Sequence, residues 1–166
     1  MKFAGSYGFE LTPEVMWEKL NDPVFLRAVI PRCKKFEKRG GNIYDVASSF
    51  SIGPFPLNLR GVVRLKPVQP PRVYMMKAEA SSWLGASDGI TWVNLLPHEK
   101  GVIFRYRARL AFSSELAKLG AGVLNGTVSS MVDRFFERVA IALETTLFET
   151  DEAVLGGFEG EIDDRV

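Results

Sequence analysis

Apolar and polar side chains alternate along six stretches of the chain. In the first, residues 2–10, Phe3 and Phe9 fall on one face, while small or polar side chains fall on the other. Five similar stretches follow between residues 42 and 112, and glycine or proline marks most of the short turns between them. A period of two residues is typical of strands with one buried face, and short turns favour antiparallel neighbours. We therefore predict a six-stranded antiparallel sheet with one apolar face.

Residues 12–30 and 113–143 show the spacing of helices. Thr12-Pro13 and Asp22-Pro23 each combine a capping side chain with a proline at the first helical position, which predicts two short helices. Between residues 113 and 143, apolar side chains recur every three or four positions, which predicts one long amphipathic helix. The arrangement is α+β. We expect the long helix to cover the apolar face of the sheet, because no other helix is long enough to do so.

The composition is that of one globular protein. The 166 residues are 46% hydrophobic and 25% charged, and no apolar run approaches the roughly 18 residues that span a bilayer. The first residues lack the apolar stretch of a secretory signal, so we predict a cytoplasmic protein. A single cysteine and a single histidine exclude a disulfide framework and a His-rich metal site. We therefore predict neither a metal nor another cofactor.

The net charge of +1 conceals two regions of opposite charge. Residues 1–150 contain 20 Lys or Arg and 14 Asp or Glu, whereas residues 151–166 contain one Arg and six acids. The second region also contains three glycines and shows no helical period. We expect residues 1–150 to form the domain and residues 151–166 to form an acidic, flexible tail that frays from it.

A ligand cavity under the long helix is the central functional hypothesis. Gly120, Gly122 and Gly126 fall near the start of this helix, where missing side chains would leave space above the sheet. Inward-facing aromatic, methionine and hydroxyl-bearing side chains suit an apolar pocket with few polar groups. The alternative is a solid core in which the glycines allow close packing of the helix. The candidate wall residues are Phe50, Leu59, Tyr74, Met76, Tyr106, Leu124 and Met131, with Phe25 and Ile30 from the short helices and Trp83 at the mouth.

Catalysis has little support in the sequence. Cys33 has no base near it in the chain, and His98 falls in a polar turn between two strands. No glycine-rich phosphate-binding motif is present. We therefore predict no catalytic residue. An enzyme of the cyclase or dehydratase kind, as an alternative use of the same cavity, would depend on Tyr74 and Tyr106.

Five cations gather within eight residues after the second short helix. Such a cluster favours peripheral contact with anionic lipid headgroups at the inner face of the membrane, or with an acidic partner. The alternative is a solvated loop. Nucleic acid is not an expected partner, because the chain is not strongly basic. The five residues are Arg32, Lys34, Lys35, Lys38 and Arg39.

The outer face of the predicted sheet is a candidate interaction surface. Its residues Trp92, Arg105, Arg107 and Arg109 fall on neighbouring strands. A tryptophan among arginines favours cation–π contact and is typical of protein interfaces, so we predict a homodimer or partner surface here. The alternative is a surface satisfied within the chain, in which Glu79 pairs with an arginine across strands.

Five short motifs are spaced along the chain: IPRC (30–33), IGP (52–54), PPRVY (70–74), AKLG (117–120) and RFFERVA (134–140). In their order and spacing they resemble the family of the carbon monoxide dehydrogenase G subunit, over about residues 2–148. This family belongs to the START-like, or SRPBCC, superfamily. The resemblance implies a helix-grip fold, in which a curved antiparallel sheet wraps around a long C-terminal helix.

The same resemblance implies a function. It suggests a protein that binds a lipid-like molecule, such as a quinone, and that assists a molybdenum carbon monoxide dehydrogenase at the membrane. The chain departs from many relatives in two respects. It carries acids where they have a hydrophobic C-terminal anchor, and it carries Arg32 where their IPxC segment often has glycine. Both departures bear on membrane attachment rather than on the cavity.

Overall fold

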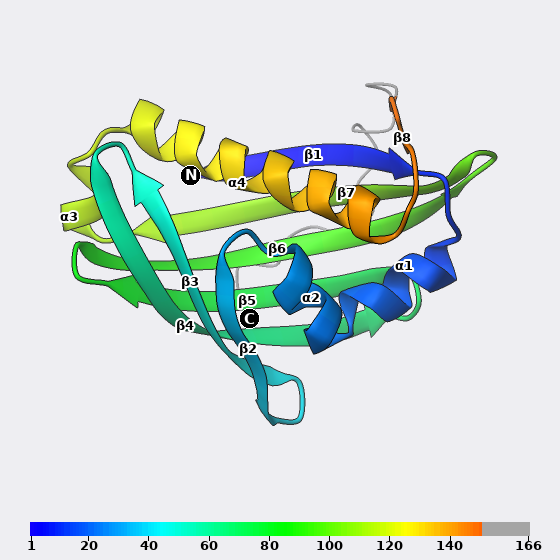
Figure 1. Cartoon of the computed structure of the whole chain (residues 1–166), viewed down its shortest axis with the longest axis horizontal. Coiled ribbons are helices and arrows are strands. Elements are labelled where there is room, and N and C mark those ends of the chain that lie inside the picture. Colours follow the sequence, from blue (N-terminus) through cyan, green and yellow to red (C-terminus); the bar gives the residue numbers. More distant parts are fainter. Residues whose placement is uncertain (151–166) are drawn as a thin grey trace.

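An eight-stranded antiparallel sheet forms the frame of the protein, and the computed structural model describes residues 1–150 of the chain (Figure 1). The strand order is β2-β3-β4-β5-β6-β7-β1-β8, so strands β2 to β7 follow one another as hairpins and β1 pairs with β7. The strands are β1 (Lys2–Phe9), β2 (Cys33–Gly40), β3 (Ile43–Ile52), β4 (Phe55–Gln69), β5 (Val73–Ser82), β6 (Gly85–His98), β7 (Gly101–Phe112) and β8 (Leu147–Phe148).

Four helices complete the described part of the chain. The two predicted caps form, because the Thr12 hydroxyl accepts a hydrogen bond from the backbone N–H of Val15, and the Asp22 carboxylate accepts one from that of Val24. No helix within residues 1–150 is both long and apolar enough to cross a membrane. The helices are α1 (Pro13–Leu20), α2 (Pro23–Val29), α3 (Ser114–Ala117) and α4 (Ala121–Ala142).

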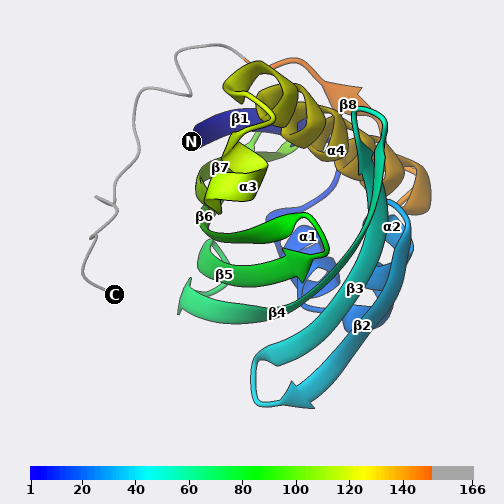
Figure 2. The ribbon, with the colours of Figure 1, turned by 90° about the vertical axis from the view of Figure 1, so that its left-hand side faces the viewer.

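The sheet is strongly curved, and its concave face holds the helices. In Figure 2 the sheet bends from β1 through β4 to β2, and α4 crosses the open side between β1 and β3. On the same side, α1 packs on β6 and β7, while α2 packs on β2 and α4. The predicted α+β helix-grip fold is therefore confirmed.

Two strands and one break in the long helix differ from the prediction. Residues 33–40, where cations favoured a loop, form the edge strand β2, and only Phe36 in it is buried. Charged side chains and bulges are typical of edge strands, where they discourage pairing with other chains. The strand β8 is too short to produce a pattern. The predicted single helix is divided into α3 and α4 because Gly120 adopts a left-handed φ of 94°, which glycine tolerates at little cost.

The main core lies under α1 and the C-terminal half of α4. Phe136 of α4 is at its centre, and its ring packs on those of Tyr7, Phe9 and Phe104. A smaller buried cluster lies at the other end of the concave face and consists of Ile52, Leu57, Leu116 and Leu124. The side chains of the main core that are almost completely buried are Phe9, Met16, Leu20, Val29, Leu95, Val102 and Val139.

A cavity between the sheet and the long helix as candidate functional site

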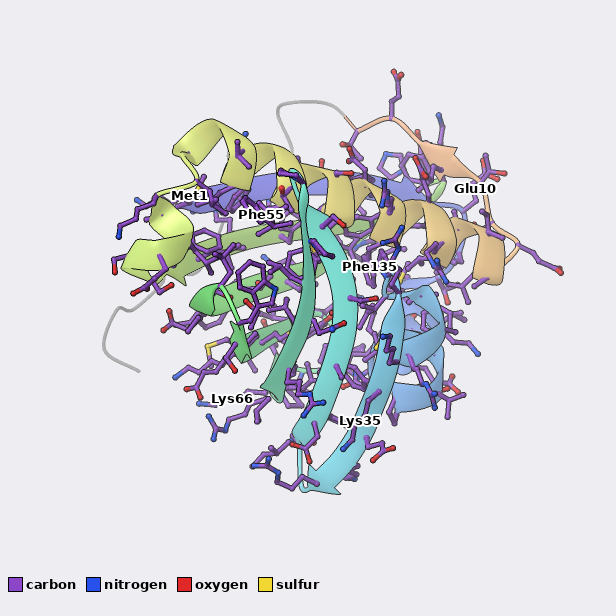
Figure 3. The ribbon with its side chains drawn as sticks, turned by 60° about the vertical axis from the view of Figure 1, so that its left-hand side comes forward. Met1, Glu10, Lys35, Phe55, Lys66 and Phe135 are labelled. Atoms are coloured by element: carbon purple, nitrogen blue, oxygen red, sulfur yellow. The ribbon has the colours of Figure 1, made fainter. Side chains whose placement is uncertain are left out.

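A cavity of about 400 Å³ lies between the two buried clusters. Its floor is the concave face of strands β3 to β7, and its roof is α4 from Leu124 to Phe136 together with α2. Figure 3 shows the side chains that fill the space around it, with Phe135 of α4 labelled. The described wall is almost entirely apolar, and its polar side chains carry only hydroxyl groups, from Tyr74, Ser82, Ser87, Thr91, Tyr106 and Thr127.

Eight of the ten predicted ligand-binding residues line this cavity. Their convergence follows from strand alternation, since residues at every second position of β3, β4, β5 and β7 point to the concave face. The eight residues are Ile30, Phe50, Leu59, Tyr74, Met76, Tyr106, Leu124 and Met131.

The other two predicted residues, Phe25 and Trp83, lie outside the wall. Phe25 packs at the margin of the main core, where the Lys19 ammonium lies 5.8 Å from the centre of its ring. Trp83 is 66% exposed in the tight turn between β5 and β6. Its indole N–H donates to the Pro56 carbonyl, and its ring meets the edge of Phe55, which Figure 3 labels at the neighbouring turn. Trp83 therefore packs on the neighbouring turn, although the adjacent Ser82 lines the cavity.

Several wall residues were not predicted. Phe36 was hidden in the stretch of cations that forms β2, where one apolar residue among charges gives no period. Thr127, Val128 and Phe135 belong to the predicted helix, but helical spacing alone does not show which flank of the apolar stripe borders a void. The alternation of β4 contained the signal for Leu57, which precedes Leu59 by two positions.

The glycines of α4 do not create the cavity, which corrects the sequence-based explanation. A side chain placed at Gly122 or Gly126 would meet no atom within 4 Å, and both residues are exposed. They therefore face solvent rather than the sheet. The alternative of close helix packing at these glycines is wrong for the same reason. The cavity lies instead between α4 and the curved sheet, whose strands β3 and β4 bend away from β1 (Figure 2).

A second, polar pocket of about 290 Å³ adjoins the cavity between β1 and α4. The two share the side chains of Phe3, Tyr106 and Val132. In the polar pocket the Tyr7 hydroxyl donates a hydrogen bond of 2.9 Å to the Asp133 carboxylate. The Tyr106 phenol therefore stands at the border between an apolar space and a polar one.

Burial raises the pKa of three tyrosines in this region. Burial is the main cause for Tyr74 and for Tyr106, and the nearby Asp133 carboxylate also raises the pKa of Tyr106. The pKa of Tyr7 is raised by burial and then by its hydrogen bond to Asp133. An ordinary phenol is already neutral at physiological pH, and these shifts move its ionisation further above that range.

The remaining candidates for chemistry lie apart from the cavity. The Cys33 thiol donates to the Lys35 carbonyl at 3.2 Å, and burial raises its pKa, which disfavours the reactive thiolate. His98 lies at the β6–β7 turn, where its ring stacks on Phe148 and its Nδ1 accepts from the backbone N–H of Lys100.

The five clustered cations follow the edge strand β2 and the turn before it. Arg39 forms a two-pronged ion pair with Asp45 on β3, and Lys35 lies 3.6 Å from Glu37. Lys34 and Lys38 are exposed, as is Arg32. Contact of this edge with anionic lipid remains a prediction.

The predicted interaction surface lies on the convex face of the sheet. Trp92 pairs with Arg107 across β6 and β7, but its side chain is half-buried rather than exposed. Glu79 does reach an arginine across strands, namely Arg64 at 4.0 Å, which is not one of the three on β7.

The fold recurs in solved structures. A conserved protein from Geobacillus kaustophilus has a TM-score of 0.80 and 21% identity, and the match covers 90% of this chain and 100% of that one. A protein from Rhizobium leguminosarum has a TM-score of 0.68 and 11% identity, with 87% and 94% covered. An HSP90 activator from Plasmodium falciparum has a TM-score of 0.58 and 15% identity, with 89% and 99% covered. At these identities the likeness shows the fold alone.

The sequence itself identifies the family. No curated protein matches it. Residues 5–144, however, match the family described as the G subunit of carbon monoxide dehydrogenase (CoxG). This range runs from β1 to the end of α4 and contains nearly every residue that lines the cavity. The resemblance seen in the sequence is confirmed, and the chain belongs to the CoxG family, that of the carbon monoxide dehydrogenase G subunit.

Proposed function

We propose that this protein binds an apolar small molecule of the lipid or quinone kind in the cavity under α4. We further propose that it serves a molybdenum carbon monoxide dehydrogenase-type oxidoreductase as an accessory protein. The observation that carries the first proposal is the cavity. Its volume of about 400 Å³ lies within the range of roughly 300–1,000 Å³ that small-molecule sites occupy.

The chemistry of the wall supports an apolar guest. A ligand gains about 25 cal/mol for each Å² of apolar surface that it removes from water, and aromatic and aliphatic side chains surround this space. Met76 and Met131 bring flexible thioethers, which adapt to ligands of different shape.

The adjoining polar pocket supports a ligand with one polar end. A carbonyl or hydroxyl group placed at the border would meet the Tyr106 phenol, while the apolar part of the ligand stays under α4. The phenol is neutral at physiological pH and can donate a hydrogen bond, and burial raises its pKa further. A quinone ring or the head of a lipid has this combination of groups.

Binding is favoured over a reaction in this cavity. The described wall contains hydroxyl groups but no carboxylate, imidazole or amine that would act as a base. Tyr74 and Tyr106, on which the alternative enzyme would depend, keep their protons. The family supports the accessory role at a coarse level, because it is described as a subunit of carbon monoxide dehydrogenase.

Titration with a water-soluble menaquinone analogue tests the binding site. The fluorescence of Trp17 reports on this site, because its ring contacts Tyr74 of the cavity wall edge-on, with 5.6 Å between the ring centres. In a variant that carries Trp83→Phe and Trp92→Phe, Trp17 is the one remaining tryptophan, and we expect the analogue to quench its fluorescence to saturation. Val128→Phe places a larger side chain in the cavity and should abolish the quenching. Val123→Phe is the matched control, since Val123 lies on the same helix with 44% of its surface exposed and should leave binding intact.

Mass spectrometry under native conditions separates a lipid from a quinone. Protein isolated from its own cells should carry one extra mass, and extraction with solvent should release the molecule for identification. Equal behaviour of the two Val→Phe variants, or protein that takes up neither class of molecule, would contradict the proposal. Co-purification of the protein with a molybdenum-containing dehydrogenase tests the accessory role separately.

A further inference from the structure

The convex face of the sheet carries buried side chains, although α1, α2 and α4 lie on the concave face (Figure 2). Met75, Ile103 and Arg105 alternate with residues that point to the concave face, so they point to the convex one. Their side chains are nevertheless only 4–5% exposed. Within the described residues, Met75 and Ile103 belong to neither of the two core clusters. The convex face therefore has a buried patch of its own.

This patch also contains polar atoms that need partners. The indole N–H of Trp92 and the amide oxygen of Asn94 are buried, and neither has a hydrogen-bond partner among the described residues. Leaving such a group unsatisfied costs about 1–3 kcal/mol. A segment that covers the patch and offers backbone N–H and C=O groups would remove this cost.

The strand β8 brings the chain to this face. The ring of Phe148 stacks on His98, and it lies where a side chain at position 8 would be, so only glycine fits at Gly8. Two residues later, the Thr150 hydroxyl lies 2.5 Å from the Ser6 hydroxyl. Because Ser6 is the register partner of Arg105, the last described residue of the chain lies beside the buried arginine.

The direction of β8 sets the course that a continuing chain would take. It runs antiparallel to β1, so a chain that continues along this edge passes Ala4 and then Lys2. Their register partners on β7 are Arg107 and Arg109. Residues 151–166 hold six acids and one arginine, whereas residues 1–150 hold an excess of six cations. The segment and the face are therefore complementary in charge as well as adjacent.

We propose that residues 151–166 bind the convex face of the same chain, with their acids toward Arg105, Arg107 and Arg109 and their apolar side chains over Trp92 and Met75. Sixteen residues in an extended form reach about 50 Å, which exceeds the length of the twelve-residue strand β7. The segment supplies apolar cover from Val154, Leu155, Phe158 and Ile162.

The setting of Arg105 supports this arrangement. Burial and the neighbouring Arg107 guanidinium both lower its pKa, which means that its charge is costly there. Carboxylates beside a desolvated guanidinium offset that cost. The surface that the sequence marked as an interface would then be occupied from within the chain, and another protein would have to displace the segment to bind. The expectation of a frayed tail concerns residues outside the described range, and this proposal replaces it.

Zero-length cross-linking of the full chain tests the proposal. A carbodiimide joins a carboxylate to a lysine amine only when the two are in contact. Lys2 on β1 is the register partner of Arg109, and Lys77 on β5 is separated from Arg109 by Ile90 of β6. A mixture of light and ¹⁵N-labelled protein separates contacts within one chain from contacts between chains. We expect links from residues 151–166 to Lys2 or Lys77, all within one isotope, and none to Lys34 on the distant edge strand. The yield should fall several-fold in 1 M salt, where the screening length is about 3 Å.

Two outcomes would overturn the proposal. Links that join light and heavy chains would show that a second copy occupies the face, and an absence of links to either lysine would show that the segment does not bind it. A second measurement uses the indole resonance of Trp92. Changing the six acids of residues 151–166 to amides should shift it and expose it to solvent. The same change at six exposed acids elsewhere (Glu10, Glu14, Glu18, Glu37, Glu99 and Glu137) should not. Equal spectra for the two variants would count against the proposal.

Discussion

The two ends of the concave face are built from the same layers but differ in how they are filled. Under α1 and the C-terminal half of α4, side chains such as Phe9, Met16 and Val139 are at most 1% exposed and belong to one core cluster with Phe104 and Phe136. Under the N-terminal half of α4, the helix rests on a much smaller cluster, and about 400 Å³ beside it is empty of side chains. The first end is a packed core, and the second end encloses a cavity. We call them the packed end and the hollow end.

This difference divides stability from binding. A packed interior loses contacts whenever an atom is removed, because neighbouring side chains relax only in part. Some side chains that border the cavity, such as Met131, are only partly buried and therefore have fewer contacts to lose. We infer that the side chains of the packed end provide most of the folding stability, whereas those of the hollow end determine which ligand binds.

A matched pair of methionine substitutions gives the largest expected effect. Met16 is fully buried in the packed end, so Met16→Ala should lower the free energy of unfolding by about 2–5 kcal/mol. Met131 lines the cavity and is only partly buried, so Met131→Ala should cost less than about 1 kcal/mol. Urea unfolding followed by circular dichroism measures both.

The binding assay should reverse this order. Met131→Ala changes the wall of the cavity and should alter the affinity for the menaquinone analogue, whereas Met16→Ala should leave the affinity unchanged under conditions in which the protein stays folded. Similar losses of stability in the two variants would remove the distinction between the ends.

The sequence predicted the sheet and most of the cavity wall, but not the reason why the space is empty. Alternation placed Tyr74, Met76 and Tyr106 on one face, because the period of a strand decides the direction of each side chain. The sequence also predicted a cavity under the long helix, but it could not show what keeps that space empty, since a void depends on the curvature of the sheet and its distance from the helix rather than on any one residue. The glycines of α4 were the wrong signal for it, as the exposure of Gly122 shows.

Two other features were hidden for different reasons. The strand β2 has cations at most positions, so its pattern resembles a loop, and only pairing with β3 makes it a strand. The burial of Arg105 on the convex face contradicts its sequence pattern, in which arginines alternate with inward-facing residues and should be solvated. Both depend on contacts between residues far apart in the chain, which local periodicity does not report.

The pH dependence of stability tests whether the hollow end is dry. Tyr74 lines the cavity, and its burial raises its pKa well above the ordinary value of 10. Below pH 10 the phenol is neutral in both the folded and the unfolded chain, so stability does not depend on it. Above pH 10 the unfolded chain loses the proton while the folded protein retains it. Each further pH unit should then favour unfolding by up to about 1.4 kcal/mol.

Tyr74→Phe should therefore flatten the loss of stability between pH 10 and 11, as measured by urea unfolding at each pH. Tyr7→Phe is a useful comparison, because Tyr7 donates to Asp133 at the polar side and contributes its own raised pKa. If the free energy of unfolding of Tyr74→Phe falls with pH as steeply as that of the unchanged protein, water in the cavity must solvate the phenol. The cavity would then be hydrated rather than dry.

The smallest expected effect comes from two backbone positions, one at each end. Arg32 follows the wall residues of α2 with a φ of 53°, and Glu144 follows α4 with a φ of 49°. Left-handed conformations cost an ordinary residue about 1–2 kcal/mol, and glycine avoids most of this cost but loses more chain entropy on folding. Arg32→Gly and Glu144→Gly should each stabilise the protein by up to about 1 kcal/mol. Lys118→Gly, at a right-handed φ of −63°, should not.

Hydrogen exchange distinguishes the two glycine substitutions. Glu144 ends α4 in a motif in which the N–H of Thr145 donates to the Ala140 carbonyl, beside the packed core, so Glu144→Gly should slow exchange throughout the protein. Arg32 accepts a hydrogen bond from the N–H of Ser49 at the rim of the cavity. If the hollow end opens independently of the core, Arg32→Gly should slow exchange mainly at Ser49 and its neighbours in β2 and β3. If Arg32→Gly slows hydrogen exchange equally throughout the protein, the two ends unfold as one unit. The hollow end would then not open independently of the packed core.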